Sequence, residues 1–435
     1  MVIEVEKNQK TYKDYLIFWL GQRLSLLGSA AVQFVIIWWI TVETQSAMYL
    51  ALAAILGFGT QILLTPIAGV YVDRWSRKKI IAITDTIQAL ATLFLIISFL
   101  VNIGNLWFVL LMLTIRGMCQ AFHSPAIAAI TPIMVPENKL QQMNSWNYLA
   151  NGLINIVGPV VAAFLLVFLK FEIVLAIDII TYIMAIIPLI WITIPSVIDS
   201  ESNQLDRGKT SFIKDFKGGL GVITGIPGFT ALILISSLLN FLITPIDILL
   251  PYVINVVYNG TAENLALVLA CFNVGLILGA VGMSLNKREI KRKLLFAWIL
   301  IYILNIGYGI LAFTPNNSFT YVILGAGLFL MGLVLPAVNI MFMTIFQQVI
   351  PPEKQGRVFS VMTAIGSGIT PLGMFLSGFL SDLIGVNTLF LACTVASTVI
   401  ITVAWFFTDV KFFGNPRTDD IAHVVTEEEA KVVLG

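Results

Sequence analysis

Twelve long apolar stretches, separated by short polar segments, make up most of this chain of 435 residues. They cover residues 15–42, 47–71, 80–101, 106–134, 142–168, 173–194, 225–257, 264–285, 294–313, 320–349, 358–384 and 388–411. A helix needs about 20 apolar residues to cross a bilayer core of about 30 Å. A soluble helix would need a polar face, which these stretches lack. Only 11% of the residues are charged. The sequence therefore predicts an all-α membrane protein with twelve transmembrane helices.

The basic residues of the loops predict how the helices are oriented. Alternate loops and the two ends hold all of the 25 Lys and Arg residues except Lys170, Arg23 and Arg116. Lysine and arginine accumulate on the cytoplasmic side of membrane proteins. We therefore expect a multi-pass protein of the plasma membrane with both termini in the cytoplasm, which requires an even number of spans.

A weak internal repeat divides the twelve stretches into two halves. Residues 136–139 (PENK) resemble residues 351–354 (PPEK), and Gly117 and Gly332 are related by the same offset. Chance similarity between apolar sequences is the alternative. Two copies of six spans predict parallel repeats related by an axis along the membrane normal. The expected parts are a six-helix bundle at 1–194, a cytoplasmic linker at 195–217, a second six-helix bundle at 218–411 and a cytoplasmic tail at 412–435.

Several classes of protein lack support in the sequence. Three cysteines fall inside the apolar stretches without metal-binding spacing, and the chain has only two histidines. No glycine-rich loop leads into Gly-Lys-Ser/Thr, the pattern of an ATP-binding loop, and no nucleophile elbow occurs. We expect no enzymatic activity, no metal and no cofactor. A small-molecule substrate, protons and the lipid bilayer are the expected partners of a monomer, and nucleic acid is not. A receptor or scaffold without transport is a distant alternative.

A short basic turn follows the second apolar stretch. Its pattern is carried by Gly69, Asp73, Arg74, Arg77 and Lys78. The turn resembles the GxxxDRxGRK signature of the major facilitator superfamily, with Ser76 where glycine is usual. The resemblance implies two six-helix bundles and gives the turn the role of a conformational latch that holds the bundles together.

Further segments resemble the macrolide-efflux type of drug exporters within that superfamily. They lie at residues 116–126, 135–137, 176–178, 245–251, 356–360 and 385–387. The resemblance implies a secondary transporter that exports amphiphilic drugs such as macrolide-like compounds, with multidrug resistance as the consequence and proton antiport as the driving reaction. Relatives of this type also export siderophores. Transport of a siderophore or another small solute, in either direction and without proton antiport, is therefore the alternative.

Ionisable residues inside the apolar stretches are the candidates for transport, because a charge at the bilayer centre costs about 2.5–3.5 kcal/mol on insertion scales. At 1.5 Å per residue, Arg116 lies roughly 15 Å, Asp247 roughly 16 Å and Arg23 roughly 12 Å from the nearest loop. Asp178 and Asp85 lie roughly 9 Å from a helix end. Arg23 and Asp247 depart from the macrolide-efflux pattern, so the substrate does not follow from that pattern.

Arg116 is the first candidate for proton coupling. Gln120 and His123 follow it by four and seven residues and share its helical face. In the superfamily, an arginine in the fourth helix is associated with proton coupling, although the usual glutamine follows three residues later. The alternative is a structural arginine paired with an acid on another helix. His123 could carry a proton or be a packed hydrogen-bonding residue.

Two acids are candidates for holding a proton or the substrate. Asp247 follows a proline and could bind a cationic drug or a proton. A fixed ion pair with Arg23 or Arg116 is the alternative. Asp178 could play the same part or simply pair near a helix end. Asp85 could be a local counter-ion of the basic turn.

The fifth stretch carries a small-residue pattern. Gly152, Gly158 and Pro159 resemble the antiporter motif of drug exporters, although Ala162 and Ala163 replace its paired glycines. Small residues allow helices to approach closely, so ordinary helix packing is the alternative.

Overall fold

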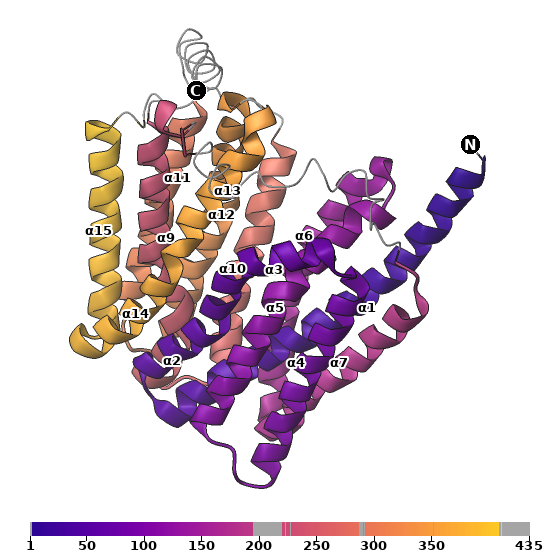
Figure 1. Cartoon of the computed structure of the whole chain (residues 1–435). Helices are drawn as coiled ribbons and strands as arrows, with labels where there is room; N and C mark the ends of the chain where they lie inside the picture. The colour runs from indigo at the N-terminus through magenta and orange to yellow at the C-terminus, as the bar shows by residue number, and fades with distance from the viewer. Residues whose placement is uncertain are drawn as a thin grey trace. The chain divides into compact units, whose positions relative to one another are not determined.

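The chain folds into helices. The computed structural model describes residues 2–194, 220–221, 223–226, 228–286, 290, 292–350, 352–408 and 410. These residues form helices and no strand, and twelve helical segments are long and apolar enough to cross a membrane (Figure 1). The prediction of an all-α membrane protein with twelve transmembrane helices is confirmed.

Most predicted stretches agree with the helices to within a few residues, but α1 begins thirteen residues before the predicted stretch at 15–42. The first six spans consist of α1 (Val2–Thr44), α2 (Ala47–Ala54), η1 (Ile55–Gly59), α3 (Thr60–Arg74), α4 (Arg77–Leu100), α5 (Leu106–Met134), α6 (Glu137–Phe168) and α7 (Phe171–Trp191). The last six consist of α9 (Phe229–Tyr252), η2 (Val253–Val257), α10 (Ala262–Leu285), α11 (Lys293–Ala312), α12 (Thr320–Val349), α13 (Pro352–Gly368), α14 (Thr370–Ile384) and α15 (Val386–Phe407).

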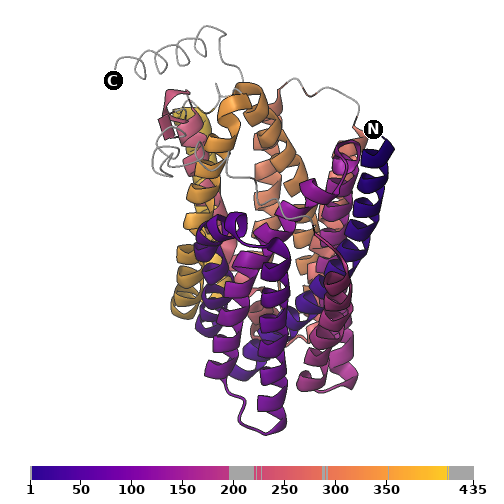
Figure 2. The same ribbon diagram turned by 45° about the vertical axis from the view of Figure 1, so that its right-hand side comes forward.

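Spatial contacts divide the chain into two compact units. The first consists of Met1–Ile198, Ile248–Asn273 and Met374–Asp382, and the second of Asp199–Asp247, Val274–Gly373 and Leu383–Gly435. In the first unit, α1 packs against α6 and α7, α4 packs against α5 and α7, and α3 packs against α5 (Figure 2). In the second unit, α11 packs against α12 and α15.

The expected domain boundaries stay predictions. The linker at 195–217 and the tail at 412–435 lie outside the described residues. The two bundles at 1–194 and 218–411 each include the six spans that the sequence assigned to them.

Two spans contain a π-helical turn, a feature that often marks functional sites. η1 interrupts the second span between α2 and α3, and η2 ends the seventh span after α9. At η1 the Gly57 carbonyl lies so close to Gly117 of α5 that a Cβ on Gly117 would clash with it. The second span therefore approaches α5 directly beside Arg116.

We expect Gly117→Ala to lower the free energy of unfolding by about 1–3 kcal/mol, because the added methyl must displace the backbone of η1. Thermal unfolding in detergent, followed by tryptophan fluorescence, measures the loss. Gly282→Ala is the matched control. A Cβ there meets nothing within 4 Å, and helical Gly→Ala gains up to about 1 kcal/mol. Equal stability of the two variants would contradict the close approach at Gly117.

Candidate functional site

Polar side chains on α1, α4 and α5, all buried except the half-buried Ser29, form two layers in the first unit. Each helix contributes two of them, spaced seven residues apart: Gln22 and Ser29 on α1, Asp85 and Thr92 on α4, and Arg116 and His123 on α5. Seven residues are about two helical turns, or about 10 Å along the axis. Because the spacing is the same on all three helices, one residue of each pair lies in the first layer and the other lies in the second.

The first layer is an ion pair between α5 and α7, which we call the arginine–aspartate layer. The Arg116 Nη1 donates to Asp178 Oδ2 at 2.6 Å and to the Thr92 hydroxyl at 2.6 Å. The carboxylate of Asp178 also accepts the hydroxyls of Thr92 at 2.6 Å and Ser29 at 2.9 Å. Arg116 is 6% exposed and Asp178 4%. Removing one partner of such a pair leaves a buried, unpaired charge, which costs about 3–5 kcal/mol.

The second layer, which we call the histidine layer, joins α5, α4 and α1. The Nε2 of His123 lies 3.0 Å from Asp85 Oδ1 and 3.2 Å from Gln22 Oε1. The Gln22 amide donates to Asp85 Oδ2 at 3.1 Å. The three side chains are 2–6% exposed. Because Nε2 faces two oxygens, the hydrogen-bond network assigns a proton to it.

The structure separates residues that the sequence places on one helical face. Arg116 and His123 are both buried, but each belongs to a different layer. Gln120 joins neither, because its amide donates to Ser124 on the same helix at 3.1 Å. Asp85 contacts His123 and Gln22, so the structure shows no counter-ion role toward the basic turn. Sequence reasoning missed Gln22, whose signal was an amide inside an apolar stretch.

Arg23 lies in a third polar cluster, between α1 and α6. Its Nη1 and Nη2 donate to the amide oxygens of Asn151 at 2.5 Å and Asn147 at 2.7 Å. The guanidinium also lies over the ring of Trp19, 5.4 Å from the ring centroid. Its Nε is buried without a hydrogen-bond partner, and none of the described acids pairs with it. The positive charge of Arg23 is therefore solvated by amides and an aromatic face but not neutralised.

Asp247 differs from the other acids of the spans. It lies in α9, and its side chain is exposed. No described residue of the second unit forms an ion pair or hydrogen bond with it. Arg116 is engaged by Asp178, and Arg23 by amide oxygens. The expected alternative, a fixed ion pair of Asp247 with Arg23 or Arg116, stays a prediction.

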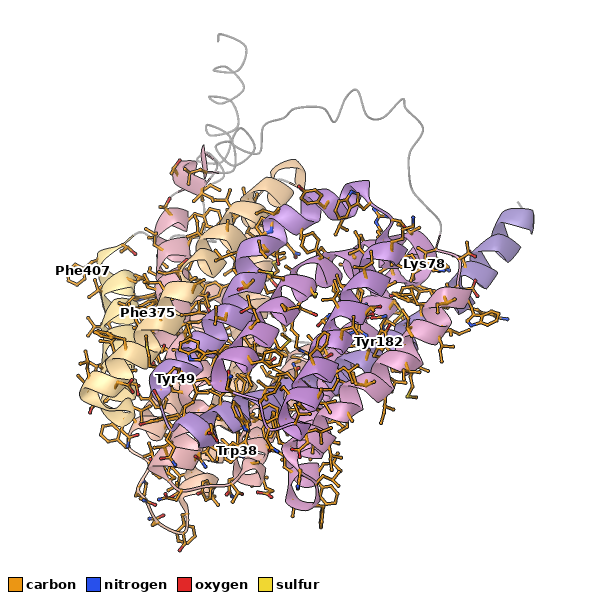
Figure 3. All side chains as sticks on the ribbon, turned by 60° about the horizontal axis from the view of Figure 1, so that its bottom comes forward. Trp38, Tyr49, Lys78, Tyr182, Phe375 and Phe407 are labelled. Carbon is orange, nitrogen blue, oxygen red and sulfur yellow. The ribbon has the colours of Figure 1, made fainter. Side chains whose placement is uncertain are left out.

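The basic turn separates α3, which ends at Arg74, from α4, which begins at Arg77. The Lys78 Nζ donates to the carbonyls of Ile190 at 3.0 Å and Ile192 at 2.6 Å, at the C-terminal end of α7 (Figure 3). A cation is favourable there, because the last carbonyls of a helix lack partners and carry the negative end of its dipole. Lys78 therefore fastens α4 to α7 within the first unit.

The structure shows less about the other residues that we expect to form the latch. A Cβ on Gly69 would meet nothing within 4 Å, and Arg77 is half-buried. The side chains of Asp73 and Arg74 lie outside those that the structure describes. A role of this turn in holding two bundles together stays a prediction.

The small residues of α6 face α1. A Cβ on Gly158 would lie 2.8 Å from the Cβ of Ala30, so the two helices approach closely at this point. Pro159 lies within α6, which continues beyond it, and Gly152 lies about two turns earlier on the same helix. Close packing of α6 on α1 is observed, and the antiporter role of this motif stays a prediction. No group of three or more described His, Cys, Asp or Glu residues could hold a metal ion.

Known proteins resemble this chain over almost its whole length. A sequence profile of the Major Facilitator Superfamily matches residues 18–373. The chain belongs to this superfamily. Macrolide efflux protein A of Streptococcus pyogenes is 33% identical to this transporter over 401 residues, covering 92% of this chain and 96% of that protein. The Staphyloferrin A transporter of Staphylococcus aureus is 21% identical over 415 residues, covering 91% and 96%.

Solved structures of transporters share the fold. A bacterial homologue of the iron transporter ferroportin superposes with a TM-score of 0.67 at 18% identity, covering 91% of this chain and 98% of that one. The predicted superfamily and the resemblance to the macrolide-efflux type are confirmed. The chain is thus a multi-pass membrane transporter and not an enzyme.

Proposed function

We propose that this transporter exports amphiphilic drugs, such as macrolide-like compounds, from the cytoplasm by proton antiport. Macrolide efflux protein A, the relative described above, supports the cargo class. We place the protein in the plasma membrane as a monomer. Both termini lie in the cytoplasm in this proposal, because nearly all loop lysines and arginines fall on one side. A proton that enters across 100 mV releases about 2.3 kcal/mol, which can drive the export.

The observation that carries this proposal is the unpaired carboxylate of Asp247 within a membrane span. A charge in that position is unfavourable unless something neutralises it. A proton and a cationic group of the cargo both neutralise a carboxylate, and they cannot do so together. Their exchange at Asp247 would link cargo release to proton binding. Asp178, the other candidate acid, has its charge taken up by Arg116 and two hydroxyls.

Proteoliposomes that contain the purified protein and a luminal pH dye test this proposal. We expect external erythromycin to make the lumen more alkaline at a faster rate than in protein-free liposomes, because each cargo molecule that enters expels a proton. The protein-free liposomes correct for passive entry of the weak base. Equal rates with and without protein, at verified incorporation, would rule out proton antiport of this cargo.

The uncompensated charge of Arg23 favours a second candidate function. A cation held only by amides and an indole ring can accept an anionic group of a solute. This observation supports transport of a siderophore or another small acidic solute without proton antiport. The same proteoliposomes distinguish the two functions, because such a solute would accumulate without a change of luminal pH.

A further inference from the structure

The two buried layers of the first unit differ in their capacity to exchange a proton. Arginine is not deprotonated in proteins, so Arg116 keeps its charge. The carboxylate of Asp178 accepts the guanidinium and the hydroxyls of Ser29 and Thr92. Neutralising either partner would leave the other charge buried alone. The arginine–aspartate layer is therefore a pair of fixed charges and does not carry the driving proton.

The histidine layer has the chemistry that the first layer lacks. Imidazole gains and loses a proton near neutral pH. The Nε2–H of His123 points at Asp85 and Gln22, so a second proton would bind at Nδ1. With His123 neutral, the layer carries the charge of Asp85 alone. With His123 protonated, an imidazolium lies 3.0 Å from that carboxylate and the layer is neutral.

We propose that His123, held by Asp85 and Gln22, is the proton-binding site that drives this transporter. The inference rests on the proton coupling proposed above, but it assigns the driving proton to His123 in place of Asp247, so that Asp247 binds only the cargo. One proton enters from the outer side and binds at the imidazole. The same proton then leaves the imidazole for the cytoplasm. No other covalent bond forms or breaks in the cycle.

Burial of the layer links its protonation to helix packing. His123, Asp85 and Gln22 come from three helices that enclose the layer, and each is less than 9% exposed. A lone buried carboxylate is costly, whereas a hydrogen-bonded ion pair is less so. Loss of the proton therefore favours conformations in which water reaches the layer, and binding of the proton favours the closed packing seen in the structure. A bound proton shifts the equilibrium between two conformations only because it binds one of them more tightly than the other.

Several other ionisable side chains on the surrounding helices are already engaged. Among the described side chains, these include Tyr15 of α1 (hydrogen-bonded to Thr131), Arg23 of α1 (to Asn147 and Asn151), Lys78 of α4 (to two carbonyls of α7), Arg116 of α5 (to Asp178), Tyr182 of α7 (to Thr86) and Tyr71 of α3 (against Phe122 and Trp75). Lys13, Asp14 and Glu43 of α1 and Arg77 and Lys79 of α4 lie on the same helices. Cys119 lies one turn before His123 on α5 and is a free thiol near Arg116 and Asp85. Within the first unit, Asp85 is thus the acid that faces His123.

The histidine content allows a direct test of proton binding. The chain has two histidines, and His423→Gln leaves His123 as the only imidazole. In the full chain in lipid nanodiscs, with ¹⁵N-labelled histidine, we expect one imidazole signal that changes from the neutral to the protonated form when a proton binds. Asp85→Asn should lower the fraction of protonated imidazole in the same buffer, because the variant removes the adjacent anion. Thr131→Val, a loss of a buried hydroxyl on the same helix, should leave that fraction unchanged.

Transport by His123→Gln tests whether this proton drives the cycle. In proteoliposomes, a gradient of one pH unit supports about tenfold accumulation of erythromycin per coupled proton. We expect His123→Gln to abolish this accumulation and to retain exchange of labelled for unlabelled erythromycin without a gradient. Glutamine can keep the hydrogen bonds of the layer but cannot bind the proton.

The outcomes separate the two proposals. An imidazole signal that does not titrate, or a His123→Gln variant that still accumulates erythromycin, would overturn the proton site. A titrating imidazole in a wild-type protein that shows no gradient-driven transport would instead count against proton antiport and leave the proton-binding site standing.

Discussion

Replacing Arg116 by glutamine should lower the free energy of unfolding by about 3–5 kcal/mol, the largest loss that we expect from a single substitution in this transporter. The variant leaves the carboxylate of Asp178 at 4% exposure with two hydroxyl donors and no counter-ion. Thermal unfolding in detergent measures the loss. The variant should keep the same transmembrane topology.

The double variant Arg116→Gln with Asp178→Asn is the matched control. It removes both charges and keeps groups that can hydrogen-bond to Thr92 and Ser29. Buried pairs replaced together lose much less stability than pairs broken on one side. We therefore expect the double variant to recover most of the loss. A double variant as unstable as the single one would show that the charge pair is not what stabilises this layer.

Asp247→Asn should abolish uphill efflux while insertion into the membrane stays intact. Asparagine has nearly the shape of aspartate but can neither bind a proton nor neutralise a cationic cargo. Efflux against a concentration gradient in cells that overproduce the variant, with its membrane content measured by immunoblot, gives the result. Glu263→Gln, an exposed acid in the first turn of α10, controls for the loss of a carboxylate elsewhere.

Unchanged uphill efflux by Asp247→Asn would remove Asp247 from the mechanism and return it to the role of a structural acid. Comparison with His123→Gln is also informative. If Asp247 binds cargo and His123 binds the proton, Asp247→Asn should lose exchange as well as accumulation, whereas His123→Gln should lose only accumulation.

Local sequence predicts the helices of this protein well because the membrane imposes a length and a composition on each of them. The predicted stretch at 106–134 coincides with α5, and the stretch at 47–71 covers α2, η1 and α3. The π turn at η1 was not predicted. It lies where Gly57 comes close to Gly117, a residue on a different helix.

Partners of the charged residues were predicted less well. Arg116 was identified as a candidate from its depth, from the helical face that it shares with Gln120 and His123, and from the superfamily resemblance. Its pairing with Asp178 depends on the packing of α7 beside α4 and α1. A counter-ion role toward the basic turn was one interpretation of Asp85, because it is close to that turn in sequence. The fold instead directs it toward His123 and Gln22.

The sequence by itself determined that this protein crosses the membrane twelve times, belongs to a transporter superfamily and carries a small number of ionisable groups within its spans. Composition and motif spacing along the chain are sufficient for those conclusions. Only the tertiary structure decided that Arg116 is held by Asp178 and that His123 is held by Asp85. The physical reason is that a side chain in a low-dielectric interior takes its chemistry from the charge beside it, and that neighbour comes from another helix.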